Sequence, residues 1–154
     1  MGAVSAARTV LELGQNALAA GAGALAVRVA HTGAGWQLAV LDDGPGIPAA
    51  VLAGAYPAGH GLALVQAGGR LALRNVPGGA LALAALPAGA PAGDLAGAAA
   101  ALCQHESAPA VALWITGPRG EWRMALPVGP GAGQACAARD AVRRGLEQTG
   151  IPPQ

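Results

Sequence analysis

Residues 24–42 decide the fold of this chain. They read Ala-Leu-Ala-Val-Arg-Val-Ala over 24–30, His-Thr-Gly-Ala-Gly over 31–35 and Trp-Gln-Leu-Ala-Val-Leu-Asp over 36–42. Apolar runs with β-branched members on both sides of a glycine-containing turn are typical of two strands joined as a hairpin. The sequence therefore predicts a pair of neighbouring strands here, and the other elements are placed around it.

A helix is predicted immediately before the hairpin, from about residue 5 to residue 20. Its apolar residues recur at three- and four-residue steps, as Val4, Ala7, Leu11 and Leu18 do. Ser5 is a suitable N-cap, and Gly21 is a suitable residue to end the helix. This segment is expected to cover the hairpin with its apolar side.

Short helices and a second strand pair are predicted after the hairpin. The Gly/Pro cluster at 44–48 breaks the chain, and Pro77-Gly78-Gly79 marks a second turn. The expected elements are short helices at 49–54 and 61–67 and strands at 70–75 and 80–86. This order of elements predicts an α+β fold, a two-layer sandwich in which helices cover a mixed, mostly antiparallel sheet.

The stretch 87–93, Pro-Ala-Gly-Ala-Pro-Ala-Gly, has the composition of a linker. It predicts a first domain over 1–87, a linker over 88–93 and a small α+β unit over 94–154. The elements expected in the last part are a helix at 95–104 capped by Asp94, strands at 109–115 and 121–127, and a helix at 134–147. A helix–hairpin–helix unit of about 60 residues is marginally stable alone, so we expect it to pack on the first domain or on a second subunit.

The tryptophans and cysteines of the C-terminal unit are interpreted as structural residues. Trp114 and Trp122 are expected to anchor the packing of the unit, and self-association into a homodimer is the alternative. Cys103 and Cys136 are too few and too far apart for a disulfide framework or a metal site. We expect both to be reduced thiols at packing positions.

Composition excludes several classes of function. The net charge is +1 and 11% of the residues are charged, so neither nucleic acid nor an acidic membrane is an expected partner. All nine basic residues are arginine, which excludes a phosphate-binding loop with a lysine and Schiff-base chemistry. No run of about 18 apolar residues lacks Gly, Pro or a charge, so no membrane span is predicted. The start of the sequence has no signal-peptide pattern, so a cytoplasmic protein is expected.

The acidic residues of residues 1–93 are the first candidates for chemistry. There are three of them, Glu12, Asp42 and Asp43, and a carboxylate is costly in an apolar stretch unless it has a partner. Glu12 and Asn16 are four positions apart on the predicted helix and leave it from the same face. A carboxylate there can act as a general base on water, and an amide oxygen can bind Mg²⁺ beside a triphosphate. The alternative is a solvated helix face.

Glycines accompany the other candidate residues. Asp42 ends a predicted strand and could accept a hydrogen bond from an adenine amino group, while Gly44 and Gly46 would let the backbone approach the base. The alternative is a polar turn after a strand. Gly59-His60-Gly61 precedes a predicted helix and could present backbone N–H groups to phosphate. That last signal is weak by itself in a chain with 25 glycines.

The order and spacing of these motifs resemble the GHKL superfamily, which comprises the ATP-binding domains of gyrase B subunits, sensor histidine kinases and mismatch-repair MutL proteins. Residues 12–22, Glu-Leu-Gly-Gln-Asn-Ala-Leu-Ala-Ala-Gly-Ala, resemble its N box. Residues 42–48, Asp-Asp-Gly-Pro-Gly-Ile-Pro, resemble its first glycine box, and residues 59–64, Gly-His-Gly-Leu-Ala-Leu, resemble the second. The resemblance covers roughly residues 8–87 and implies a Bergerat-type sandwich.

The resemblance also implies roles and cofactors. Glu12 is implied to be the catalytic general base, Asn16 the Mg²⁺ ligand beside the nucleotide, and Asp42 the residue that reads adenine. The remaining nucleotide contacts implied by the glycine boxes are Gly44, Gly46, Ile47, Gly59, His60, Gly61 and Leu62. ATP and Mg²⁺ are the implied cofactors, and ATP and ADP are the implied small-molecule partners.

A narrower resemblance is to small stand-alone histidine-kinase-like ATPases encoded beside bacterial iron-only hydrogenase genes. Their N box resembles residues 11–17, Leu-Glu-Leu-Gly-Gln-Asn-Ala, and their tail begins with a Gly-Asp before an alanine-rich helix, as Gly93-Asp94-Leu95-Ala96 does here. This second resemblance would cover the whole chain.

The sequence departs from the family in the segment between the glycine boxes. Twelve residues, 47–58, lie between Gly46 of the first box and Gly59 of the second, so the usual ATP lid is cut short, and Gly79-Ala80 stands where the family often has Gly-Thr. A short lid excludes water less well. We therefore expect an ATP-binding regulatory module with slow hydrolysis or phosphoryl transfer, working with another protein. The alternative is a degenerate relative that serves as an interaction scaffold without useful ATP turnover.

Overall fold

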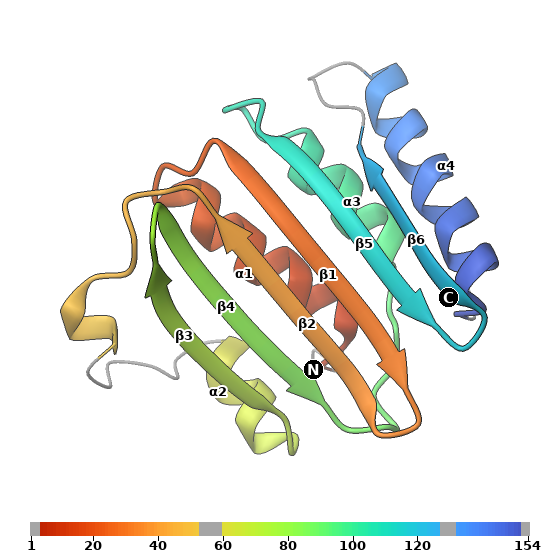
Figure 1. Cartoon of the computed structure of the whole chain (residues 1–154), viewed down its shortest axis with the longest axis horizontal. Helices are drawn as coiled ribbons and strands as arrows, with labels where there is room; N and C mark the ends of the chain where they lie inside the picture. The colour runs from red at the N-terminus through yellow and green to blue at the C-terminus, as the bar shows by residue number, and fades with distance from the viewer. Residues whose placement is uncertain (1–3, 53–59, 127–131, 152–154) are drawn as a thin grey trace.

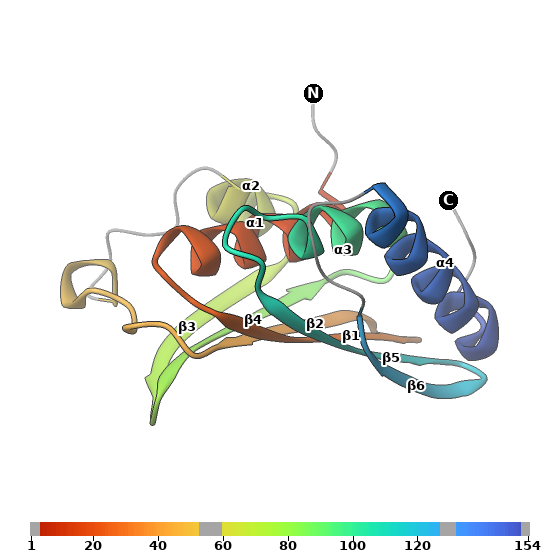
Figure 2. The same cartoon turned by 90° about the horizontal axis from the view of Figure 1, so that it is seen from above.

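The computed structural model describes residues 4–52, 60–126 and 132–151, and at 60–62 and 132 it describes the backbone alone. Within these residues six strands form one sheet in the order β3-β4-β2-β1-β5-β6 (Figure 1). The four described helices all lie on the same face of that sheet (Figure 2). The protein is thus an open two-layer sandwich, which confirms the predicted α+β class and the mixed, mostly antiparallel sheet.

The first helix and hairpin form as predicted, as α1 (Ala6–Ala19), β1 (Ala24–Thr32) and β2 (Gly35–Asp42). The Ser5 Oγ accepts a hydrogen bond from the Arg8 N–H at 3.1 Å, which confirms the N-cap. Gly21 follows the helix with φ +107°, a conformation that favours glycine. The two strands pair antiparallel as far as Thr32 opposite Gly35, so the turn is shorter than the five residues predicted.

The second strand pair consists of β3 (Arg70–Val76) and β4 (Gly79–Leu86), and β4 pairs antiparallel with β2. Ahead of it, α2 (His60–Gln66) lies over β3, as both views show. The other short helix, predicted at 49–54, is a single helical turn at 49–52, and the rest of that prediction lies outside the described residues.

The C-terminal unit consists of α3 (Leu95–Cys103), β5 (Ala110–Gly117), β6 (Gly120–Ala125) and α4 (Ala132–Thr149). It packs on the first part of the chain, one of the two arrangements expected of it. β5 pairs in parallel with β1, and α3 packs against both α1 and α4. The Ala6 and Ala7 N–H groups also bond to carbonyls within 88–93. The division into two domains stays a prediction from sequence; in the structure both parts share one sheet.

Alternation along each strand gives the sheet two different faces. The face under the helices is apolar and buried, and the other face is uncovered by the described helices (Figure 2). The sheet side of the core includes Leu25, Val27, Val29, Trp36, Leu38, Val40, Ala84, Leu86, Val111, Leu113 and Ile115. The helices contribute Val10, Leu18, Leu102, Val142 and Leu146 to the same cluster.

The strand register determines which face of the sheet each of the two tryptophans of the C-terminal unit lies on. Trp122 is opposite Ile115 and packs against the core beside Gly145 of α4, as predicted. Trp114 is opposite Arg123, so it lies on the uncovered face, and its predicted role as a core anchor is wrong. The sequence predicted that both tryptophans lie in strands, but it could not predict that they lie on opposite faces of the sheet.

The two cysteines also have different environments, although both are free thiols. Cys103 is buried between the layers, and burial raises its pKa to about 11 because the thiolate would lose solvation. Cys136 is exposed on α4, so its predicted packing role is wrong. In the described ranges, no helix combines the length and apolar character that a membrane crossing needs.

Candidate functional site

The first helix presents Glu12 and Asn16 on the side that faces away from α3. Gly14 lies against α3, where a Cβ atom would stand 2.6 Å from the Leu102 Cδ2 atom. Helix positions two apart differ by about 200° in direction, and Glu12 and Asn16 are each two positions from Gly14. Both therefore point to the opposite side of α1, and Figure 1 shows that α2 is the helix on that side.

The two side chains differ in their local contacts. The Glu12 side chain is 36% exposed, and its Oε1 lies 3.7 Å from a guanidinium nitrogen of Arg8. A partly exposed ion pair of this kind contributes little to stability. Asn16 is exposed, and its side chain makes no hydrogen bond within the part of the chain that the structure describes. Its amide is therefore available to a ligand.

Asp42 is the last residue of β2, on the helix-covered face. It follows the buried Trp36, Leu38 and Val40 at two-residue steps. Its Oδ1 accepts a hydrogen bond from the Gly44 N–H at 2.8 Å, and its Oδ2 has no partner among the residues that are described. A Cβ at Gly44 would stand 3.0 Å from the Asp42 Oδ1, so the glycine lets the loop turn closely around the carboxylate.

Asp43 ties the same loop to the start of β1. Its Oδ1 accepts hydrogen bonds from the N–H groups of Gly23 at 2.8 Å and Ala24 at 2.9 Å. These bonds, the one from Ala24 most strongly, lower the pKa of Asp43 below its ordinary value of 3.8 because they stabilise the charged form. Asp43, to which sequence analysis gave no role, thus has a structural one: it holds the loop against the start of β1.

Asn75 of β3 clamps the other end of the loop. The Ile47 N–H donates to the Asn75 Oδ1 at 2.6 Å, and the Asn75 Nδ2 donates to the Ile47 carbonyl at 3.1 Å. Gly46 has φ +94°, and a Cβ there would stand 2.9 Å from the same Oδ1. Sequence analysis missed Asn75. The sequence did hold one sign of its role. Asn75 follows Leu71 and Leu73 at two-residue steps, which places its amide on the helix-covered side of β3.

The second glycine box is only partly described. Gly59 lies outside the described residues. The backbone of His60, Gly61 and Leu62 forms the first turn of α2, as the sequence predicted for 61 and 62. Their contacts with a nucleotide stay predictions.

These elements border one region above β2 and β4. The C-terminal end of α1 lies at the glycine loop, since a Cβ at Gly44 would stand 3.4 Å from the Ala22 backbone nitrogen. Asn16 is thus nearer to the loop than Glu12 is, by about 6 Å along the helix axis. The region has the end of β2 on one side, the α2-facing side of α1 along its length, and α2 across from it (Figure 1).

The oxygen atoms of Asn16 and Glu12 are few, and they suit a metal ion that binds together with a phosphate ligand. Within the described ranges, no cluster of three or more His, Cys, Asp or Glu residues could hold a metal. Mg²⁺ commonly takes one or two protein oxygens and completes its shell with phosphates and water. The Asn16 amide, with the Glu12 carboxylate one turn away, is a set of that kind.

Comparison with known proteins adds no assignment. No protein-family model matches the chain, and no curated protein matches it. The resemblance to the GHKL superfamily therefore stays a prediction from the three sequence motifs.

Proposed function

We propose that the protein is a Mg²⁺-dependent ATP-binding regulatory module of the GHKL type, with slow hydrolysis or phosphoryl transfer. One observation carries the proposal. The contact of Gly14 with Leu102 sets the rotation of α1 so that Glu12 and Asn16 face away from α3, and the C-terminal end of α1 lies at the glycine loop that follows Asp42. This arrangement supports a shared site for the three side chains.

The chemistry of the region suits a purine nucleotide. The Asp42 Oδ2 is an acceptor at the end of a strand, where it would bind the adenine amino group. Its neighbour in register on β4 is Ala80, which has no polar side-chain atom, so recognition of the base would depend on Asp42. Asn16 would ligand Mg²⁺ at the phosphates, and Glu12 would orient and deprotonate the attacking water.

Turnover is expected to be slow. Only twelve residues lie between Gly46 and Gly59 of the two glycine boxes, and α2 has seven residues. A short cover excludes water incompletely, and an open site weakens the electrostatic stabilisation of the transition state. Regulation of another protein by nucleotide-dependent binding is the role that fits such a site.

Isothermal titration with MgATP, MgADP and MgGTP tests the binding. We expect MgATP and MgADP to bind and MgGTP to bind at least tenfold more weakly. Asp42→Asn should weaken MgATP binding by about 10- to 150-fold, the range for a hydrogen bond to a charged group. Asp43→Asn is the matched control, since it makes the same change next door and keeps an oxygen for Gly23 and Ala24; its affinity should stay within about threefold. Equal affinities of the Asp42 variant and the natural protein would overturn the proposal, and absence of MgATP binding would favour the interaction scaffold.

Phosphate release tests the role of Glu12. If the natural protein hydrolyses ATP, Glu12→Gln should lower the rate by about 10²–10⁴ while the affinity stays nearly unchanged. A loss of affinity as large as the loss of rate would assign Glu12 a structural role instead.

A further inference from the structure

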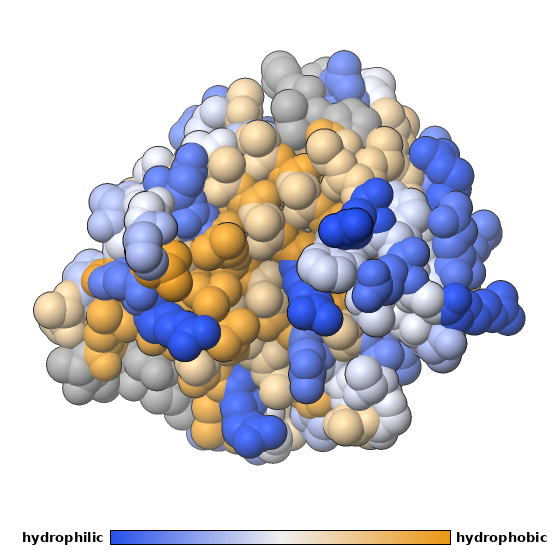
Figure 3. Space-filling model, viewed as in Figure 1, coloured by the Kyte–Doolittle hydropathy of each residue, from blue (hydrophilic) through white to orange (hydrophobic). Residues whose placement is uncertain are grey.

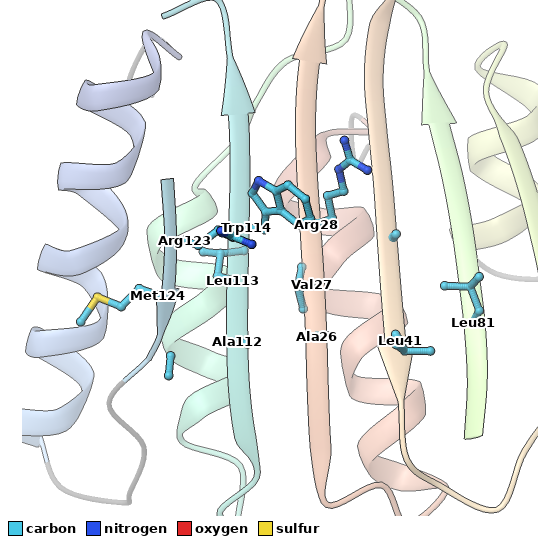
Figure 4. Close-up of a pocket in the computed structure, with 12 residues that line it drawn as sticks. Ala26, Val27, Arg28, Leu41, Leu81, Ala112, Leu113, Trp114, Arg123 and Met124 are labelled. Carbon is cyan, nitrogen blue, oxygen red and sulfur yellow. The ribbon is translucent and has the colours of Figure 1, made fainter. Parts of the chain in front are cut away.

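The uncovered face of the sheet carries a hollow of about 590 Å³, on the opposite side from the proposed nucleotide region. Its floor consists mainly of the small residues Ala26, Ala39, Ala112 and Ala125. Leu41 and Leu81 border it on one side, and Arg28, Trp114 and Arg123 border it on another. Figure 3 shows the apolar surface at the centre of this face with hydrophilic side chains beside it, and Figure 4 shows the lining residues, Arg28 and Arg123 among them.

The register of the sheet explains this arrangement. Ala26, Ala112 and Ala125 lie side by side on β1, β5 and β6, and Leu41 and Leu81 continue the same row on β2 and β4. The large residues of the row thus lie at one end of it, and the alanines leave space at the other.

The neighbouring row places two cations around an indole ring. Arg28, Trp114 and Arg123 lie side by side on β1, β5 and β6. The Arg28 Cζ stands 4.8 Å from the centre of the Trp114 ring, and the Arg123 Cζ stands 5.1 Å from it. The ring attracts both cations, but it offers them no hydrogen-bond acceptor of the strength of a carboxylate.

The donors in this row lack acceptors. Among the described residues, no carboxylate lies within 4.0 Å of either arginine, so neither forms an ion pair. The Trp114 Nε1 in this row is buried and has no hydrogen-bond partner in the same part of the chain. A negatively charged group over the row would complement the two unpaired guanidinium groups.

Charge also argues against a second copy of the chain as the occupant. Register assigns four arginines to the uncovered face, Arg28, Arg70, Arg74 and Arg123, against a single described acid, Glu121. Two such faces packed together would oppose like charges, which is unfavourable across an interface. The volume lies within the range of small-ligand sites, which are mostly apolar and have few polar groups.

We propose that this hollow binds an amphiphilic carboxylate. The alkyl tail lies over the alanine floor toward Leu41 and Leu81, and the carboxylate lies at the row of Arg28 and Arg123, whose guanidinium groups flank the Trp114 ring. The site is separate from the proposed nucleotide region because the sheet lies between them.

Titration of the full chain with decanoate tests the proposal, with the indole N–H signals of the ¹⁵N-labelled protein as the readout. Trp114→Phe assigns the signal of Trp114. That signal should shift in a saturable way, with a Kd of about 0.05–1 mM for a probe of this size. Trp36 is an internal control: its Nε1 donates to the Ala90 carbonyl at 2.9 Å on the other side of the sheet, so its signal should stay in place.

Variants and a second probe separate the proposal from nonspecific binding. Arg28→Gln and Arg123→Gln should each weaken decanoate binding about 5- to 10-fold, between the effects of exposed and buried charged contacts. Arg70→Gln on β3, an arginine of the same face outside the hollow, should bind as the natural protein does. Asp42→Asn should also bind normally, which keeps this test independent of the nucleotide proposal.

Three results would overturn the proposal. The first is no saturable shift of the Trp114 signal with decanoate. The second is an equal affinity for decyltrimethylammonium, whose tail is the same and whose charge is opposite. The third is a protein that is dimeric at the concentrations used and whose Trp114 signal moves only with dissociation, which would assign the face to a second copy.

Discussion

Loss of the Asn75 clamp gives the most direct test of how the glycine loop is held. Asn75→Ala removes two hydrogen bonds to Ile47, one of 2.6 Å and one of 3.1 Å. A hydrogen bond contributes about 0.5–1.5 kcal/mol net, and these two are exposed, so their sum is about 1–2 kcal/mol. The equilibrium between the closed and open loop end should then shift by about 5- to 30-fold toward the open form.

Amide hydrogen exchange measures this shift at the affected atom. The Ile47 N–H loses its acceptor, so its protection factor should fall by the same 5- to 30-fold. Asn75→Asp keeps an oxygen for that N–H and loses the donor to the carbonyl, so it should give an intermediate loss. Gln37→Ala is the matched control, because it removes an exposed amide from the uncovered face of β2 and should leave Ile47 unchanged.

An Ile47 exchange rate that stays within about twofold of the natural protein in Asn75→Ala would refute the reasoning, since the hydrogen bonds would then not hold the loop. A fall in protection of equal size throughout the sheet would also refute it, because the clamp would then support the whole fold and not the loop.

Three further predictions concern stability and thiol chemistry. Gly79→Ala should lower the free energy of unfolding by about 3 kcal/mol in urea denaturation, because its Cβ would collide with the Asp42 carbonyl, a backbone atom that cannot yield easily. Because the pKa of Asp43 is lowered from 3.8 by the N–H groups of the β1 start, its stabilising effect is present above that pH and is lost as pH falls through the lower folded-state value. Stability measured from pH 6 to 2.5 should show that loss, and Asp43→Asn should show less of it. Iodoacetamide at pH 8 should modify exposed Cys136 readily, and Cys103, with its pKa raised to about 11, only after unfolding.

Each of these has its own control. Gly89→Ala places a methyl group in open space and should change stability by less than about 0.5 kcal/mol; an equal loss in both glycine variants would contradict the collision. A pH profile of Asp43→Asn that overlays the natural one would remove Asp43 from the acid response. Two equivalents of rapid alkylation in the folded protein would contradict the burial of Cys103.

Features set by local chemistry could be predicted from the sequence. Ser5 capping α1, Gly21 after it and the strands of 24–42 depend on residues close in the chain, where turn and capping preferences act. The strands and helices of the C-terminal unit were also predicted, because its periodic apolar residues and its Gly/Pro turns are local signals too.

Features set by long-range pairing could not be predicted in this way. The clamp joins Ile47 to Asn75, 28 positions away, and no residue close to Ile47 in the sequence indicates this pairing. The face of Trp114 depends on the register of β5 against β1, and a shift of one residue would have turned it into the core. At the candidate site, sequence indicated Glu12, Asn16 and Asp42, but the rotation of α1 that directs two of them comes from Gly14 against Leu102.

The parallel pairing of β1 with β5 has a consequence for biosynthesis. Ala24 pairs with Ala110, so the edge of β1 that pairs with β5 stays unpaired until the chain 86 positions later has been synthesised. At about 5–20 residues per second, translation leaves that edge open for about 4–17 s. An apolar strand with an unpaired edge can template pairing between nascent chains. We expect refolding yield to fall with protein concentration, and production in cells to benefit from chaperones that shield β1 until residues 110–117 have left the ribosome.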